Sequence, residues 1–147
     1  MTHWLRSTLL AAVLLAPAAH AADDSLYRAW GGREGIRAVM DDLVPRLKAD
    51  ARIGHFFKDV STQHLARQLT DQLCQLAGGP CVYDGPDMKT AHQELGVARR
   101  DFHAMVEVLQ QSMAARGIAF ADQNRMLALL APMHRDVITA GSGTAQR

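Results

Sequence analysis

Apolar residues recur at helical spacing over most of the chain. The clearest stripe repeats at i, i+3, i+4, i+7, i+8 and i+11 and consists of Ile36, Val39, Met40, Leu43, Val44 and Leu47. This spacing predicts an amphipathic helix, and Pro45 within it predicts a kink. A short helical segment from Ser25 to Trp30 is expected before it, because Gly31-Gly32 interrupts the chain between the two.

Two further elements and a loop are predicted in the middle of the chain. One or two helical turns are expected over residues 51–57. A helix follows from Ser61, whose hydroxyl can cap it, and Gly78-Gly79-Pro80 ends it. Residues 78–87 hold three glycines and two prolines and are expected to form an irregular loop. The predicted helix carries four leucines on one face: Leu65, Leu69, Leu73 and Leu76.

The C-terminal part of the chain continues the helical pattern. A short helix is expected over Met88–Leu95, and another carries an apolar stripe that ends at Arg116-Gly117. The last helix is predicted from about Ala121 as one element with Pro132 inside it. No segment alternates as a strand does, so the predicted fold class is all-α. The apolar stripe before Arg116 consists of Phe102, Met105, Val106, Leu109 and Met113.

The N-terminus has the features of an export signal. Arg6 precedes ten small or apolar residues, 7–16, and after Pro17 the tripeptide Ala19-His20-Ala21 predicts cleavage before Ala22. The apolar run is shorter than the roughly 20 residues that span a bilayer. The alternative, a buried first helix, would require an amphipathic period that is not visible there. The mature protein is therefore expected in the periplasm or outside the cell, without stable membrane insertion.

The length and net charge of the chain indicate its domain organisation and make one class of function, nucleic-acid binding, unexpected. The 147 residues, 48% apolar and 21% charged, correspond to one globular domain. The predicted boundaries are a signal peptide over 1–21, a globular domain over 22–140 and a disordered tail over 141–147. Without the signal, fifteen basic and fifteen acidic residues remain. A neutral domain is not expected to bind nucleic acid.

His92 is the most informative histidine. In the segment 88–95, Met88, Ala91 and Leu95 fall at i, i+3 and i+7, and His92 takes the i+4 position on the same face. One interpretation is a core histidine that bonds a backbone carbonyl. The other is a haem ligand, because neutral imidazole is the usual proximal ligand in oxygen-binding haem proteins.

Several short motifs decide between these interpretations, because they occur in the order and spacing found in group I truncated haemoglobins. The chain resembles that family from about Ser25 to Val137, nearly the whole predicted mature chain. The motifs are Tyr27 with Gly31-Gly32, Phe56-Phe57, Gly78-Gly79-Pro80, Tyr83-x-Gly85, Met88-Lys-x-x-His92 and Ala131-Pro132.

The resemblance implies a shortened globin, a two-over-two helical sandwich around one non-covalent b-type haem. By the same match His92 is the iron ligand, and Phe57 is the aromatic residue packed on the porphyrin. The expected function is binding of oxygen or another diatomic gas. The full set of expected haem contacts is His92, Phe57, Leu65, Leu69, Gln72, Met88 and Val44.

The helix that starts near Ser61 is expected to form the facing, distal wall. At 100° per residue, Gln72 falls about 20° from Leu65 and so lies inside the leucine stripe. A buried amide needs a polar partner, which could be the bound gas, an ordered water or a neighbouring backbone group. Gln68 lies at the edge of the stripe and is the second candidate for ligand contact. His64 is expected to face solvent or a haem propionate.

The sequence departs from the family at one distal position. Members commonly carry a tyrosine on the second helix whose hydroxyl bonds the bound ligand, and here Val44 occupies that position. The nitric oxide dioxygenase activity relies on a hydrogen bond to bound oxygen. Without the tyrosine, the resemblance alone does not predict that activity for this chain. Tyr27 and Tyr83 match positions outside the distal wall.

Cys74 and Cys81 lie close together in a chain expected to be exported, which favours a disulfide over two free thiols. On the helical wheel Cys74 lies opposite the leucine face, so it is not expected to bind haem or a metal.

The sequence lacks the motifs typical of several other cofactor sites and active sites. No Cys-x-x-Cys-His for covalent haem, Glu-x-x-His pair for a di-iron site, Gly-x-Ser-x-Gly or phosphate-binding Gly-x-x-x-x-Gly-Lys is present. Besides gas binding, two functions stay open. One is a haem enzyme that turns over nitric oxide or peroxide with a redox partner as electron donor, and the other is a haem-carrying or structural module.

Overall fold

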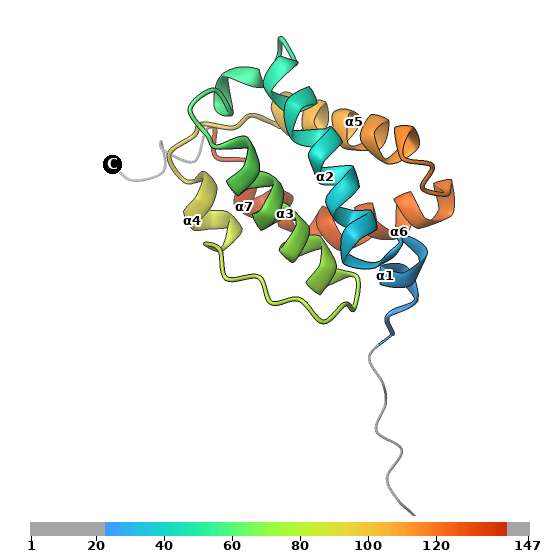
Figure 1. The fold of residues 1–147 in the computed structure, drawn as a ribbon. Coiled ribbons are helices and arrows are strands. Elements are labelled where there is room, and N and C mark those ends of the chain that lie inside the picture. The colour runs from blue at the N-terminus through green and yellow to red at the C-terminus, as the bar shows by residue number, and fades with distance from the viewer. Residues whose placement is uncertain (1–22, 141–147) are drawn as a thin grey trace, which may run out of the picture.

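The computed structural model describes residues 23–140 (Figure 1). The predicted signal peptide, residues 1–21, and the predicted C-terminal tail, residues 141–147, lie outside the described residues. Within the described part every regular element is helical, as the hydrophobic pattern predicted. The elements in chain order are α1 (Ser25–Ala29), α2 (Gly32–Ala49), the 3₁₀ turn η1 (Gly54–Phe56), α3 (Thr62–Leu76), α4 (Met88–His92), α5 (Arg99–Ala115), α6 (Phe120–Leu130), the 3₁₀ turn η2 (Ala131–Met133) and α7 (His134–Val137).

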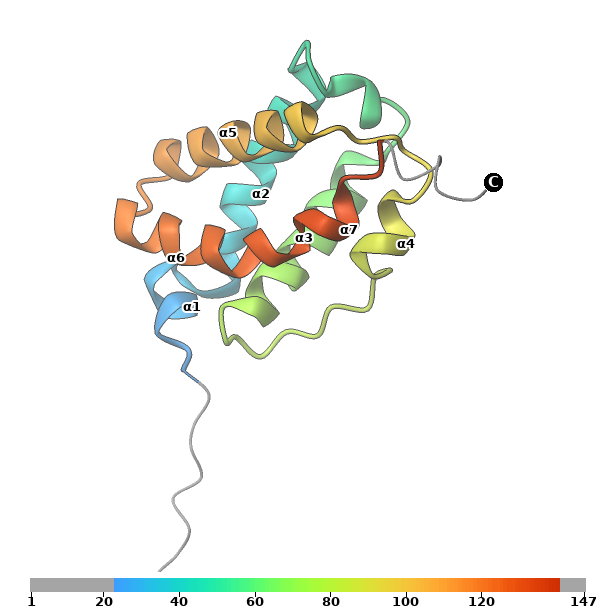
Figure 2. The ribbon, with the colours of Figure 1, turned by 180° about the vertical axis from the view of Figure 1, so that it is seen from behind.

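The helices form two layers. In Figure 1, α2 and α3 lie side by side in front, and Figure 2 shows α5 and the α6–η2–α7 segment covering them from the other side. The short helix α4 lies at the end of the molecule opposite α1 and packs against α7. This is the predicted two-over-two helical sandwich.

Helix α2 supplies much of the core. All six apolar residues of its predicted stripe are buried, none more than 3% exposed. Trp30, which joins α1 to α2, is 1% exposed, and its indole nitrogen donates to the carbonyl of Asp122 on α6. The turn after Trp30 needs glycine, because Gly31 has φ +80° and a Cβ on Gly35 would lie 1.8 Å from the Trp30 carbonyl oxygen.

Two predicted helices are shorter than expected. The helix expected over Met88–Leu95 ends at His92, and Leu95, expected on its buried face, is 44% exposed. Gly96 follows with φ +67°, a left-handed conformation that a continuing helix does not adopt.

The last helix, predicted as one element, is divided into α6, η2 and α7. Pro132 lies at the break. A proline there has no N–H to donate, and its ring clashes with the carbonyl four residues earlier, so the α-helical pattern ends before it. The break turns the chain so that α7 reaches α4.

Candidate functional site

A large apolar cavity lies between the two layers. Its volume is about 760 Å³, within the usual range for small-molecule and cofactor sites. Residues from α2, α3, α4, α5 and the α6–η2–α7 segment line it, and most of them are aliphatic or aromatic. The cavity therefore favours a large apolar ligand with a few polar attachment points.

His92 lines this cavity from the last position of α4. Its Nδ1 lies 2.7 Å from the carbonyl oxygen of Met88, one turn earlier. Because a carbonyl only accepts, Nδ1 carries the hydrogen, and in the neutral ring the lone pair is then on Nε2. That tautomer is the one a histidine needs to bind a metal through Nε2, with the Nδ1 bond fixing the ring orientation.

The short helix α4 is held at both ends. Asp87 caps its start, with Oδ1 accepting from the Thr90 amide at 2.8 Å, and this backbone hydrogen bond is the main cause that lowers the pKa of Asp87. At the other end the Thr139 hydroxyl donates to the His92 carbonyl at 3.2 Å. These contacts position His92 although α4 has only five residues.

The facing wall is α3. The Ser61 hydroxyl caps its start by accepting from the His64 amide at 3.3 Å, as predicted. Leu65, Leu69 and Leu73 line the cavity together with Gln68 and Gln72, while Leu76 does not. The helical wheel therefore placed most of this wall correctly.

Gln72 is 8% exposed, and its partners are sulfur atoms. Its Nε2 lies 3.5 Å from Sδ of Met88 on α4 and 3.9 Å from Sδ of Met133 on η2. The amide thus links α3 to the two segments on the far side of the cavity.

Gln68 and His64 are tied to their neighbours. The Gln68 Nε2 lies 3.4 Å from Oδ1 of Asp84, and its Oε1 is enclosed without a hydrogen-bond partner among the described residues. His64 is exposed at the rim of the cavity, as expected, and its Nδ1 lies 2.9 Å from the guanidinium of Arg67.

The structure places Phe57 and Met88 at the cavity but not Val44. Val44 is 0% exposed in the core, whereas Leu43 and Leu47 of the same helix line the cavity. The expectation of Val44 as a wall residue is corrected on this point. Val44 lies beside the stripe that faces the cavity, and a valine side chain is short.

Two parts of the lining were not anticipated from the sequence. Tyr83, expected outside the distal wall, lines the cavity; its hydroxyl donates to the Pro86 carbonyl at 2.8 Å, and burial is the main cause that raises its pKa. The α5 residues were predicted only to form an apolar stripe on a helix, and the spacing did not indicate that this stripe lines a cavity. Its lining members are Phe102, Met105, Val106 and Leu109.

The predicted disulfide is present. Cys74, at the end of α3, bonds Cys81 in the following loop, with their Cα atoms 5.7 Å apart. Cys74 is 0% exposed and does not line the cavity, in agreement with its predicted place opposite the leucine face.

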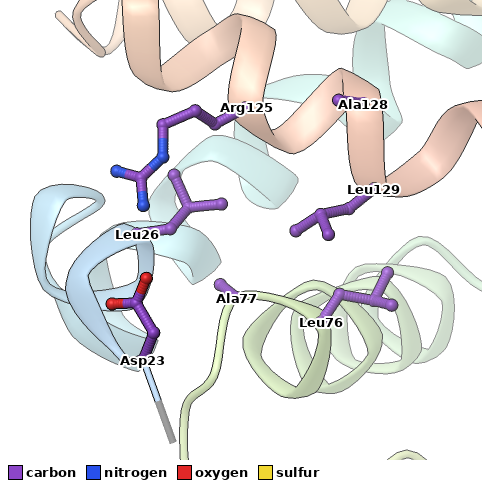
Figure 3. A pocket seen from close by; sticks show the side chains of 7 residues that line it. All are labelled: Asp23, Leu26, Leu76, Ala77, Arg125, Ala128 and Leu129. Atoms are coloured by element: carbon purple, nitrogen blue, oxygen red, sulfur yellow. The ribbon is translucent and has the colours of Figure 1, made fainter.

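A smaller hollow of about 310 Å³ lies near the start of the described chain. Figure 3 shows Arg125 and Leu129 of α6 facing Leu26 and Asp23 across it.

Among residues 23–140, no helix is long and apolar enough to cross a membrane. In the same range, no three His, Cys, Asp or Glu side chains gather as a metal site would require.

Comparison with known proteins gives one consistent result. The family described as bacterial-like globin matches residues 25–139. A group 1 truncated haemoglobin of Tetrahymena pyriformis is 29% identical over 114 residues, which are 78% of this chain and 94% of that protein. A second, from a Synechocystis species, is 34% identical over 101 residues, covering 64% of this chain and 79% of that protein.

Solved structures give the same result. The Fe(III) form of the Tetrahymena pyriformis protein superposes with a TM-score of 0.73, at 29% identity, over 77% of this chain and 97% of that one. A 2/2 haemoglobin from a Synechococcus species, solved with covalently attached haem, superposes with a TM-score of 0.72 at 20% identity, over 77% of this chain and 97% of that one. The second likeness concerns the fold alone.

Proposed function

The chain belongs to the bacterial-like globin family, as a haem-binding group 1 truncated haemoglobin. We propose that it binds one non-covalent b-type haem through His92 and reversibly binds a diatomic gas at the haem iron. A bound haem would supply an iron with one position open to a gas. His92 Nε2 would hold the iron, and Phe57 with the leucines of α3 would enclose the porphyrin.

The observation that carries this proposal is the hydrogen bond between His92 Nδ1 and the Met88 carbonyl at 2.7 Å. It leaves Nε2 as the lone-pair nitrogen of a half-buried imidazole that lines the apolar cavity. The sequence offered a core histidine and an iron ligand as alternatives. The geometry accommodates both, because the backbone carbonyl takes one ring nitrogen and leaves the other for the metal.

The cysteines of this chain argue against one kind of covalent attachment, through thioethers. Haem bound through thioethers needs free thiols, and Cys74 and Cys81 are bonded to each other. We expect acidified organic solvent to extract all the haem from the unfolded protein. Haem that stays with the chain would contradict this part of the proposal.

Export is supported by the leader pattern and by the disulfide, a bond that persists mainly in oxidising compartments. The family match starts at residue 25, shortly after the predicted cleavage before Ala22. We expect the periplasmic fraction of a bacterial host to contain a chain with the mass of residues 22–147. A cytoplasmic chain that keeps residues 1–21 would contradict export.

The experiment for haem ligation compares haem content and visible spectra of the wild type and His92→Ala. We expect the variant to lose most of its haem while its helical content persists, because His92 makes the only protein bond to the iron. His55→Ala is the control, since His55 is exposed and does not line the cavity. A five-coordinate histidine spectrum in His92→Ala would contradict the assignment and point to His64 or His103.

A further inference from the structure

We infer that the Cys74–Cys81 disulfide is coupled to haem binding: the bond slows haem loss, and a bound haem makes the bond harder to reduce. The inference rests on the proposed function, since it takes the haem to be held through His92. Neither cysteine lines the cavity, so the coupling acts through the segment of chain that the bond holds in place.

That segment is the α3–α4 loop, residues 77–87, which joins the end of α3 to the start of α4 (Figure 2). Cys81 lies near the middle of the loop and is bonded to Cys74 on α3. Tyr83, two residues further on, lines the cavity. The bond therefore joins the helix of one cavity wall to the segment that leads to His92 on the other side.

Few other contacts hold the second half of the α3–α4 loop. Cys81 packs against the hydrophobic core. Among the described residues, two hydrogen bonds join the loop beyond Cys81 to α3. The Tyr83 amide donates to Oε1 of Gln75 at 2.7 Å, and the Gln68 Nε2 donates to Oδ1 of Asp84 at 3.4 Å. Water competes for both contacts, because Gln75 and Asp84 are exposed, so the disulfide is the strongest attachment of this part of the loop.

Helix α4 depends on the loop for its position. It has five residues, none of them buried, and a helix this short is not stable on its own. Asp87, the last residue of the loop, caps its start, and the Thr139 hydroxyl bonds the His92 carbonyl at its end. Breaking the disulfide leaves the contact of Thr139 in place but frees the loop that carries the cap. The His92 ring would then be held less firmly towards a metal.

Coupling between two sites is reciprocal at equilibrium. If the disulfide raises the affinity for haem by some factor, a bound haem shifts thiol–disulfide exchange towards the disulfide by the same factor. In that exchange a dithiol gives two electrons and two protons to the S–S bond, which becomes two thiols, and the dithiol closes into its own disulfide. The reductant reaches Cys81 first, because Cys81 is half-buried whereas Cys74 is 0% exposed.

The first measurement is the rate of haem transfer from the ferric holoprotein to an excess of apomyoglobin, without any thiol reductant. It compares oxidised wild type with Cys81→Ser, and Cys81→Ala is the second variant if Cys81→Ser folds poorly. Gly35→Ala is the control for a general loss of stability. Gly35 does not line the cavity and lies beside Trp30, towards the end of the molecule opposite α4 (Figure 1).

The second measurement is the thiol–disulfide equilibrium of wild type in mixtures of reduced and oxidised dithiothreitol, read by alkylation of free thiols. Haem-free protein is compared with haem-loaded protein in its ferrous carbon monoxide form, in which thiols cannot take the open position on the iron.

We expect Cys81→Ser to lose haem about three- to tenfold faster than oxidised wild type, the change that corresponds to one hydrogen bond of the loop. Gly35→Ala should lose haem at the wild-type rate. Haem should shift the exchange equilibrium towards the disulfide, also by about three- to tenfold.

The inference is wrong if Cys81→Ser and oxidised wild type lose haem at the same rate, or if haem leaves the exchange equilibrium unchanged. It is also wrong if Gly35→Ala loses haem as fast as Cys81→Ser, because the effect would then report general stability. In these cases ligation by His92 would still stand. A wild type that binds no haem would overturn the proposed function and the inference with it.

Discussion

The Cys74–Cys81 bridge allows a prediction whose size follows from the structure. The two residues are seven apart in sequence, so the closed loop has eight residues. In the chain-entropy model such a loop stabilises the fold by about 2.5 kcal/mol. For a domain of this length that corresponds to a loss of roughly 8–12 °C in melting temperature when the bridge is removed.

Cys81→Ser is the better variant to measure, because Cys81 is only half-buried whereas Cys74 is 0% exposed. Cys74→Ser should cost more, since it also places a hydroxyl in the core. Urea unfolding of the haem-free protein gives the free energy directly. Wild type treated with a reductant should match Cys81→Ser.

The haem spectrum should change little in either variant, because Cys74 does not line the cavity. The reasoning would be refuted if Cys81→Ser unfolded at the same urea concentration as the oxidised wild type. Two alkylatable thiols in native protein from the periplasm would show that the bridge does not form there.

Two further predictions concern residues away from the cavity. Hydrogen bonds from Arg52 are the main cause that lowers the pKa of Asp50 from 3.8 to about 2, so its stabilising effect is present above about pH 4 and is lost as the pH falls towards 2. Asp50→Asn should therefore flatten the fall in unfolding free energy over this range, and an unchanged pH profile would count against the interaction. Gly35→Ala should destabilise the fold by about 1–3 kcal/mol in urea unfolding, because its Cβ would lie 1.8 Å from the Trp30 carbonyl oxygen; wild-type stability would show that the turn can shift without cost.

The helical pattern predicted the elements best where one face is buried along its whole length. The α2 stripe is an example, since each of its apolar residues is in the core. The predicted helix boundaries were wrong near Gly96 and Pro132, where α4 and α6 end earlier than the side-chain pattern predicted. The pattern of side chains continues past both residues, but backbone conformation ends the helix.

The site was predictable where contacts are local. The spacing of Met88 and His92 already allowed the carbonyl bond that orients the imidazole, and the wheel placed Leu65 and Leu69 on one wall. The partners of Gln72 could not be predicted, because they lie 16 and 61 residues away in sequence and meet it only after α4 and η2 have packed.

Val44 shows a related limit. A helical wheel gives the direction of a side chain but not its reach. Matching Val44 to a tyrosine position did not show that a valine there lies behind the cavity rather than at its surface.

The most direct test of the account is resonance Raman spectroscopy of the reduced, gas-free holoprotein, because the iron–histidine stretching mode reports the proposed bond itself. We expect this mode in the wild type, with a shift on iron isotope substitution, and its loss in His92→Gly. Added imidazole should restore haem binding and an iron–imidazole mode in that variant. An iron–histidine mode that persists in His92→Gly without added imidazole would contradict ligation by His92.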